Sequence, residues 1–258
     1  KEITCIDMFY DLTDPNKFLQ DIDMVLDDSG LFVAQLSYTP LMLKQLAFDN
    51  ILGEHYYYYS LFNLKALFER NGFKIIDCQL NDTNGGSFRV YAMKSKTDNK
   101  YFATQPYRDV ANFRVNSILE YEKTLKLDQK ETWIEFKENI DNLKNKLVSF
   151  LKEEKAKNKK IYGYAASTKS ATFLQHFNIG PDLITSIADR NPIKWGTTMP
   201  GINIPIVSED EVRQANPDYL LILSWHFAKE FIEREKDMLL KGTKFIIPCP
   251  KFEIIKLI

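Results

Sequence analysis

The sequence alternates short apolar stretches with amphipathic stretches from its first residues, and this alternation most constrains the fold. EITCIDMFY and LFVAQLSY are strand-like. Between them, DPNKFLQDIDMVLDDSG has helical spacing, with Asp14 as N-cap, Pro15 in the first turn and Gly30 as a stop signal. Because strands that alternate with helices form parallel sheets covered on both faces, the pattern predicts an α/β fold.

The first α/β segment is expected to end in a hairpin. SLFNLKALFERNGF predicts a helix from the cap Ser60 to the stop Gly72, and the strands KIIDCQL and SFRVYAMK follow it. The connection NDTNGG places Asn84 and Gly85 where a turn requires positive φ. We therefore expect an antiparallel pair that closes the sheet.

The composition changes between Ser95 and Lys160, where the runs TDNK and EEKAKNKK are strongly charged. One long amphipathic helix is expected there, preceded by another over 109–125. The apolar residues of the long helix recur at intervals of three and four: Trp133, Phe136, Ile140, Leu143, Leu147 and Phe150.

A second α/β unit follows this helical connector. Strands are expected in IYGYAAS, TSIADR, YLLILSW and KFIIPCP, and helices in TKSATFLQHF, SEDEVRQA and FAKEFIEREKDMLLKG. The pattern predicts a smaller parallel sheet, with Pro192, Pro200 and Pro205 in the loop after its second strand.

Charge and composition exclude several classes of partner. The formal net charge is -1, from 34 basic and 35 acidic residues, so no overall field favours nucleic acid or an anionic membrane. No apolar run approaches the roughly 20 residues that span a bilayer, and the first residues lack a signal-peptide pattern, so a cytoplasmic protein is expected. Cys5, Cys78 and Cys249 are widely spaced, which favours buried free thiols over a disulfide framework or a zinc site.

A glycine-rich phosphate turn does not occur in this sequence. No two of the ten glycines are separated by a single residue, and Gly163 has Ala165 where a second glycine would stand. Asp189 at the end of a strand could hold a ribose, although an acid that merely ends a strand in solvent is commoner. The first sheet begins abruptly at residue 3, so we expect an N-terminal portion to precede this chain.

Three stretches together resemble the S-adenosylmethionine-dependent C-methyltransferases that act on nucleotide-linked keto-sugars, enzymes of deoxysugar biosynthesis. They are MFYDLTDPNKFLQDI with AQLSYTPLML, AFDNILGEHYYYYSL through NDTNGGSFRVY, and YGYAASTKSATFLQHFNIGPDLITSIADRNPIKWG with PDYLLILSWHFAKEFIEREK. The similarity covers nearly the whole chain. In that family a zinc-binding domain and the glycine-rich cofactor turn precede the stretch corresponding to residue 1, so zinc is expected only in such an N-terminal domain and no metal site in this chain.

The resemblance implies three regions. Residues 1–97 would be the C-terminal half of a class I, Rossmann-like methyltransferase domain whose fourth strand begins at residue 3. Residues 98–157 would be a helical connector, and 158–258 a smaller Rossmann-like α/β domain. The implied cofactor is S-adenosylmethionine and the implied partner is a nucleotide-diphosphate sugar.

The resemblance also implies a catalytic pair: His55 matches the family's base, and Glu54 its acidic neighbour. Methylation of a carbon beside a ketone requires loss of a proton, and imidazole is the side chain best suited to take it at neutral pH. Adjacent residues point apart on a strand and diverge on a helix, so both can serve one site only from an irregular loop. Without the flanking motif, a histidine among tyrosines is more often structural.

The remaining candidate residues have alternative interpretations. Tyr10 and Asp11 are expected at the cofactor, with Asp11 standing where relatives often carry histidine. Tyr38 and Tyr59 are expected to hydrogen-bond the sugar or the developing oxyanion, and Asn84 to bind substrate although the turn alone requires it.

Three basic residues complete the expected substrate-binding set. Arg89 either clamps a phosphate or pairs with a surface acid. Lys169 opposes the helix dipole near a helix start, which a nucleotide diphosphate would explain, but a surface lysine is the alternative. His226 follows a strand at the edge of the sheet where α/β ligands bind.

A second functional class remains open from the sequence. The chain could be a non-catalytic module that binds a nucleotide sugar or a partner protein without chemistry.

Overall fold

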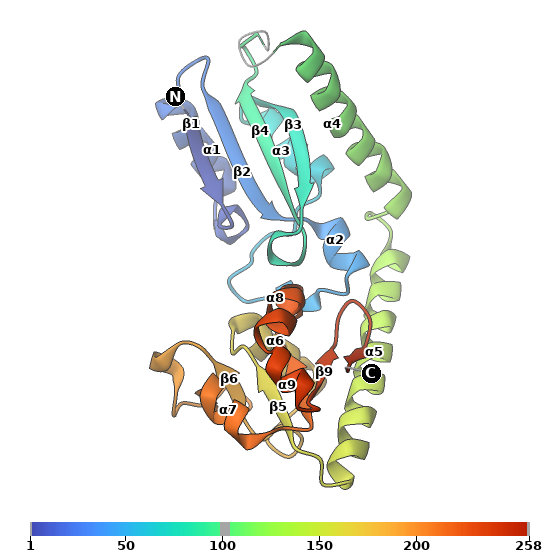
Figure 1. Ribbon diagram of the computed structural model, residues 1–258. Helices are drawn as coiled ribbons and strands as arrows, with labels where there is room; N and C mark the ends of the chain where they lie inside the picture. The colour runs from blue at the N-terminus through green and yellow to red at the C-terminus, as the bar shows by residue number, and fades with distance from the viewer. Residues whose placement is uncertain (1, 99–103, 257–258) are drawn as a thin grey trace. The chain divides into compact units, whose positions relative to one another are not determined.

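The computed structural model describes residues 2–98 and 104–256, so the expected start of the connector lies partly outside the described residues. The chain has an α/β fold with two sheets, as predicted (Figure 1). It divides into two compact units. The first comprises the residues up to Lys44 and Gly53–Ile134, and the second comprises Gln45–Leu52 and the residues from Glu135 onward.

The first unit contains a four-stranded mixed sheet in the order β1-β2-β4-β3. Its strands are β1 (Glu2–Ile6), β2 (Leu31–Ser37), β3 (Phe73–Asn81) and β4 (Ser87–Lys94). β1 and β2 are parallel, whereas β4 is antiparallel to both β2 and β3. The predicted hairpin is therefore confirmed, and it places β4 beside β2 with β3 outside it.

Helix α1 (Pro15–Val25) begins as its sequence predicts, because the Asp14 carboxylate accepts a hydrogen bond from Lys17 N–H. It ends five residues before Gly30, which is not the stop signal we expected. Leu26 takes an extended backbone and is buried. A Cβ at Gly30 would lie 2.6 Å from Leu26 Cδ1, so the glycine makes room for this side chain.

The second predicted helix and its turn are confirmed closely. α3 (Leu61–Arg70) begins where Ser60 Oγ accepts a hydrogen bond from Asn63 N–H, and Gly72 follows it at φ +80°. In the hairpin loop, Asn84 and Gly85 have φ of 54° and 86°. Both residues thus take the left-handed conformation that the turn demands.

Two long helices follow the hairpin. α4 (Gln105–Leu125) starts four residues before position 109, with Pro106 in its first turn, and runs alongside β3 (Figure 1). α5 (Lys130–Ala156) is the expected amphipathic helix. Its buried apolar residues recur at intervals of three and four: Phe136, Ile140, Leu143, Leu147 and Leu151.

The second unit contains a six-stranded sheet in the order β10-β9-β8-β5-β6-β7. Its strands are β5 (Ile161–Tyr164), β6 (Ile187–Asp189), β7 (Ile206–Ser208), β8 (Tyr219–Ile222), β9 (Lys244–Ile247) and β10 (Glu253–Ile255). All neighbours are parallel except β10, which is antiparallel to β9. The helices are α6 (Thr168–Phe177), α7 (Glu209–Ala215), α8 (Ala228–Arg234) and α9 (Lys236–Leu240).

Two features of this unit differ from the sequence prediction. Its sheet is the larger of the two that the described residues form, because it includes β7 and β10, which the sequence pattern did not predict. The expected single helix over FAKEFIEREKDMLLKG is broken at Glu235, whose side chain is buried. This carboxylate turns inward to accept hydrogen bonds from Tyr164 and Arg213.

Candidate functional site

The carboxyl ends of β1 and β2 lie at one edge of the first sheet, because these strands are parallel. A 3-10 turn, η1 (Phe9–Asp11), follows β1 at this edge. Phe9 is fully buried and packs against the rings of Phe18, Tyr59 and Phe68. This apolar anchor fixes the turn that carries Tyr10 and Asp11.

Residues 53–58 form an irregular loop, as the catalytic hypothesis required for Glu54 and His55. The loop is held against η1 because Tyr56 N–H and Tyr57 N–H both donate to the Tyr10 carbonyl, at 2.9 and 3.2 Å. His55 is thereby brought beside Tyr10, with 4.4 Å between their ring centroids.

His55 faces a carboxylate as well as an aromatic ring. Its Nε2 lies 3.9 Å from Asp11 Oδ1, and its side chain is 9% exposed. Burial raises the pKa of Asp11, the His55 charge lowers it, and the Glu54 charge raises it again. Burial and the Asp7 charge raise the pKa of Tyr10 to about 12, so its phenol stays protonated at neutral pH. The arrangement holds an imidazole between a neutral phenol and an acid.

The tyrosine run has two environments. Tyr56, Tyr57 and Tyr58 are exposed, whereas Tyr59 is buried and its ring stacks on Tyr57. Among the residues described, the Tyr59 hydroxyl has no hydrogen-bond partner, and burial raises its pKa. The Tyr59 hydroxyl is therefore a buried, protonated donor with no acceptor among the described residues.

Tyr38 occupies a different position from the one expected of a substrate-binding residue. It is 1% exposed, and its hydroxyl donates to Glu122 Oε1 at 2.8 Å. The sequence did not indicate Glu122, because its partners lie 60 to 84 residues away.

The hairpin brings two more candidates to the first sheet's carboxyl edge. Asn84 Nδ2 donates to Asp7 Oδ2 at 3.0 Å, and Asp7 directly follows β1. Arg89 donates through Nε and Nη2 to Gln35 Oε1, at 3.1 and 2.7 Å. Arg89 is thus oriented by an uncharged amide, a partner that neither sequence interpretation included.

The chain adds strands to the second sheet first on one side of β5 and then on the other. β6 and β7 extend the sheet on one side of β5, and β8 and β9 on the other. Such a switch point, at the carboxyl ends of the strands, is where open α/β sheets bind ligands. Lys169, in the first turn of α6, follows β5, and His226, in the 3-10 turn η6 (Trp225–Phe227), follows β8.

A buried acid that the sequence did not indicate belongs to this switch point. Asp49 lies in the 3-10 turn η2 (Phe48–Asn50), which packs on α6, and its Oδ2 accepts a hydrogen bond from Trp225 Nε1 at 3.1 Å. Burial raises the pKa of Asp49 to about 6, and the Lys169 charge opposes that rise. Burial, aided by the Lys169 charge, lowers the pKa of His226 to about 4. These opposite shifts keep both groups largely uncharged near pH 5.

Gly163 and Ala165 do not form a phosphate turn. A Cβ at Gly163 would lie 2.9 Å from Ile187 Cγ1, so packing against β6 explains the glycine. Ala165 has φ of 71°, a conformation that glycine would adopt more easily.

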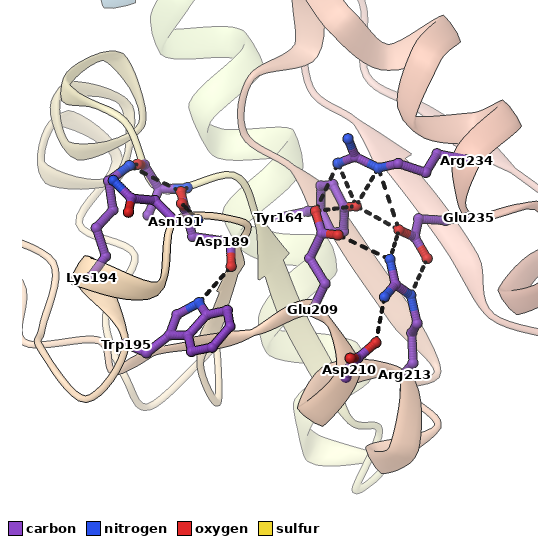
Figure 2. Close-up of polar contacts among 11 residues, drawn as sticks. Tyr164, Asp189, Asn191, Lys194, Trp195, Glu209, Asp210, Arg213, Arg234 and Glu235 are labelled. Carbon is purple, nitrogen blue, oxygen red and sulfur yellow. Dashed lines mark hydrogen bonds and ion pairs between the residues drawn. The ribbon is translucent and has the colours of Figure 1, made fainter.

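Asp189, the candidate ribose ligand, is engaged within the protein (Figure 2). Its Oδ2 accepts hydrogen bonds from Ala166 N–H and Lys194 Nζ, and its Oδ1 accepts one from Asn191 N–H. The carboxylate therefore fastens the loops after β5 and β6 to each other.

A charged network also occupies the carboxyl edge of the second sheet (Figure 2). The Tyr164 hydroxyl lies 2.8 Å from Glu209 Oε1 and 2.6 Å from Glu235 Oε1. Arg213 and Arg234 donate to these same groups. The network joins β5, α7 and α8, and no local sequence pattern marks it because its members come from separate elements.

Cys5, Cys78 and Cys249 are free and buried, as predicted. Burial raises the pKa of each thiol, so the thiols are protonated at neutral pH. Within 2–98 and 104–256, no group of three His, Cys, Asp or Glu side chains is arranged to hold a metal ion. None of the helices in these ranges has both the length and the apolar character needed to cross a bilayer.

Two comparisons with known proteins identify the family. Residues 82–250 match the family model described as C-methyltransferase C-terminal domain. The chain is also 30% identical over 247 residues to the C-methyltransferase NovU of Streptomyces niveus. That alignment covers 96% of this chain and 56% of NovU, so the chain spans about half the length of this relative. The chain therefore belongs to the C-methyltransferase family.

Proposed function

We propose that the protein transfers a methyl group from S-adenosylmethionine to a carbon of a nucleotide-diphosphate keto-sugar. Family membership supports the reaction class. The observation that carries the proposal is the placement of His55 beside Tyr10 and Asp11, at the carboxyl edge of parallel strands. In this account residues 1–97 belong to a class I methyltransferase domain, 98–157 connect, and 158–258 form the C-terminal domain.

His55 acts as the general base. Its imidazole takes the proton from the carbon beside the ketone, and the electron pair of that C–H bond moves onto the carbonyl oxygen as an enolate. The enolate carbon would then form the new C–C bond as the ketone re-forms, while the bond between the methyl group and the sulfonium would break and leave its electron pair on sulfur. The imidazolium returns its proton to solvent. Asp11, 3.9 Å from His55 Nε2, stabilises the imidazolium between these steps.

Two tyrosines assist this proton transfer. Tyr10 packs against the imidazole and limits its rotation. The Tyr59 hydroxyl, which has no partner among the described residues, donates a hydrogen bond to the developing oxyanion. Tyr38 has no direct role in this account, because its hydroxyl is bonded to Glu122.

The residues after β1 fit the cofactor. S-adenosylmethionine, when bound, supplies an electrophilic methyl group. Asp11 Oδ1 is buried and accepts no hydrogen bond among the described residues, so it is available to a donor group of the cofactor. Glu54 is exposed and supports the site through its charge, which raises the pKa of both Asp11 and Tyr10.

The substrate's nucleotide diphosphate is assigned to the switch point of the second sheet. Lys169 and His226 lie at the switch point of the second sheet, where Lys169 supplies the positive charge and His226 a neutral hydrogen-bonding group. Asn84 and Arg89 are assigned to substrate binding at the edge of the first sheet.

His55→Gln in the full-length protein tests the role of the base. Glutamine keeps the polarity of the site but cannot take the proton, so we expect methyl transfer to fall by at least about 100-fold. The melting temperature and S-adenosylmethionine affinity should be unchanged. His176→Gln is the matched control, because His176 lies in the last turn of α6 and has no role in the proposed chemistry. Undiminished transfer by His55→Gln would rule out the base.

Calorimetry separates catalysis from simple binding. Tight binding of a nucleoside diphosphate by the wild-type protein, with no methyl transfer to any keto-sugar, would instead support a non-catalytic binding module.

A further inference from the structure

The N-terminus of α3 is capped by a carboxylate from a distant helix. Glu122 of α4 accepts hydrogen bonds from Leu61 N–H at 2.6 Å and Phe62 N–H at 2.8 Å. Ser60 Oγ accepts the next one, from Asn63 N–H. The first three N–H groups of α3, which have no partners within the helix, are therefore satisfied by two side chains. The helix dipole also favours a negative charge at this place.

The same carboxylate holds the residue that follows β2. Glu122 Oε1 accepts the hydroxyl hydrogen of Tyr38, and Tyr38 forms a parallel bridge with Tyr59. Thr39 N–H donates to the Tyr59 carbonyl at 3.0 Å. Glu122 is 5% exposed, so these contacts are shielded from water. A single buried group thus fixes the end of β2 and the start of α3 to each other.

A second fixed point lies between His55 and the contacts that Glu122 makes with the start of α3. Tyr56 and Tyr57 donate their N–H groups to the Tyr10 carbonyl, one and two residues after His55. Tyr59 follows Tyr57 by two residues, and the start of α3 at Leu61 follows it by four. Through so short a segment, a shift of α3 would move Tyr57 and Tyr56, and with them the adjacent His55.

We infer that Glu122 is a positioning residue for His55, acting through the N–H groups of Leu61 and Phe62 and the hydroxyl of Tyr38. This inference rests on the proposed function for its effect on turnover, but the position of the His55 ring can be measured without turnover. Glu122 touches no reacting atom in this account.

Glu122→Gln tests the inference with the smallest change of shape. One carboxylate oxygen becomes an NH₂ group, which must face a backbone N–H or the Tyr38 hydroxyl, so at least one of these hydrogen bonds is lost. We expect kcat to fall about 10- to 100-fold, as displaced catalytic groups do, with KM changed less than about 2-fold. Glu120→Gln is the matched control, since Glu120 is on the same helix, exposed, and paired with Lys123.

Proton NMR of the full-length protein with ¹³C-labelled histidine reports on the His55 ring directly. A residue that only stabilised the fold would leave the His55 resonance unchanged. The His55 resonance is assigned by its loss in His55→Gln. In Glu122→Gln we expect the chemical shift and titration midpoint of His55 to change, while the His176 and His226 resonances stay in place. Glu120→Gln should leave all three unchanged.

Two results would overturn the inference. One is a Glu122→Gln protein whose melting temperature falls while its His55 resonance and titration match those of the wild type. The other is a Glu122→Gln protein whose kcat lies within 2-fold of the wild-type value, although His55→Gln is inactive. If His55→Gln remains active, the proposed base is wrong, and the NMR titration alone then decides whether Glu122 positions the ring.

Discussion

Asp49 is a carboxylic acid that the fold keeps out of water, although burial disfavours its ionised form. The side chain is 1% exposed, its Oδ2 accepts one hydrogen bond from Trp225, and its Oδ1 has no partner among the described residues. Burial raises its pKa from 3.8 to about 6. Residues kept ionised at such a cost are concentrated at functional sites, which agrees with its place beside Lys169 and His226.

Asp49→Asn should stabilise the protein at neutral pH and leave it unchanged in acid. Because the folded-state pKa of Asp49 is raised, folding favours the protonated carboxyl. This contribution to stability is fully present below the unfolded-state pKa of 3.8 and is lost as the pH rises through about 6. At pH 7 the ionised carboxylate costs about 3 kcal/mol, so the variant should gain up to that amount in free energy of unfolding. Asparagine can still accept the Trp225 hydrogen bond.

Urea unfolding at pH 4 and pH 7, followed by tryptophan fluorescence, measures this difference. Trp195 and Trp225 both belong to the second unit. If the free energy of unfolding differed between the wild type and Asp49→Asn by the same amount at both pH values, the raised pKa of Asp49 would be contradicted.

Glu122 and Asp49 also show which residues a sequence does not reveal. Glu122 lies in an ordinary charged stretch of α4. The backbone N–H groups that donate to its carboxylate are 60 or more residues away in the sequence. Asp49 contacts Trp225 across 176 residues. His55, by contrast, could be proposed because its motif is contiguous, and the irregular loop that it required is present.

At the scale of elements, a buried ion pair fastens α4 to β3. Arg114 donates to both carboxylate oxygens of Asp77, at 2.8 and 2.6 Å. Asp77 is fully buried and also accepts hydrogen bonds from Tyr107 and Gln79. Burial alone would raise the pKa of Asp77, but the Arg114 hydrogen bonds and charge lower it. Since α4 also carries Glu122, this pair helps to place Glu122 at the start of α3.

Arg114→Met should destabilise the protein at pH 7 by about 2–4 kcal/mol, because it leaves the Asp77 charge buried without its cation. The side chain of Arg114 is 30% exposed, so water replaces part of the lost interaction. Asp77→Asn combined with Arg114→Met should recover at least half of the loss, since no buried charge then remains.

Lys123→Met is the control for this comparison, because Lys123 is exposed on the same helix and pairs only at the surface. Chemical denaturation of the four proteins gives the free energies. A loss of less than about 0.5 kcal/mol in Arg114→Met, no larger than a surface substitution produces, would contradict the role given to this pair.

Helix boundaries set by contacts within one turn could be predicted from the sequence, whereas those set by residues far along the chain could not. Ser60 and Gly72 mark α3 correctly, because a cap and a left-handed residue act within one turn. The break at Glu235 could not be foreseen, since it is imposed by Tyr164 and Arg213 from other elements. β7 and β10, of three residues each, were not predicted.

At the scale of the whole molecule, the sequence pattern predicted the α/β class and the hairpin that completes the first sheet. It did not show that η2 packs with the second unit. Phe48 stacks on Phe173 and Phe177 of α6, which assigns Gln45–Leu52 to that unit, although the flanking residues belong to the first. Aromatic packing across more than 120 residues is a tertiary effect without a local signature.

The central claim is that the His55 imidazole removes a proton from carbon, and hydrogen exchange measures this step without methyl transfer. The full-length protein would be incubated with a nucleotide-linked keto-sugar in D₂O, without S-adenosylmethionine, and deuterium at the carbon beside the ketone followed by NMR. We predict that the wild-type protein and His176→Gln exchange this hydrogen, whereas His55→Gln does so only at the uncatalysed rate. Exchange by His55→Gln at the wild-type rate would contradict the account.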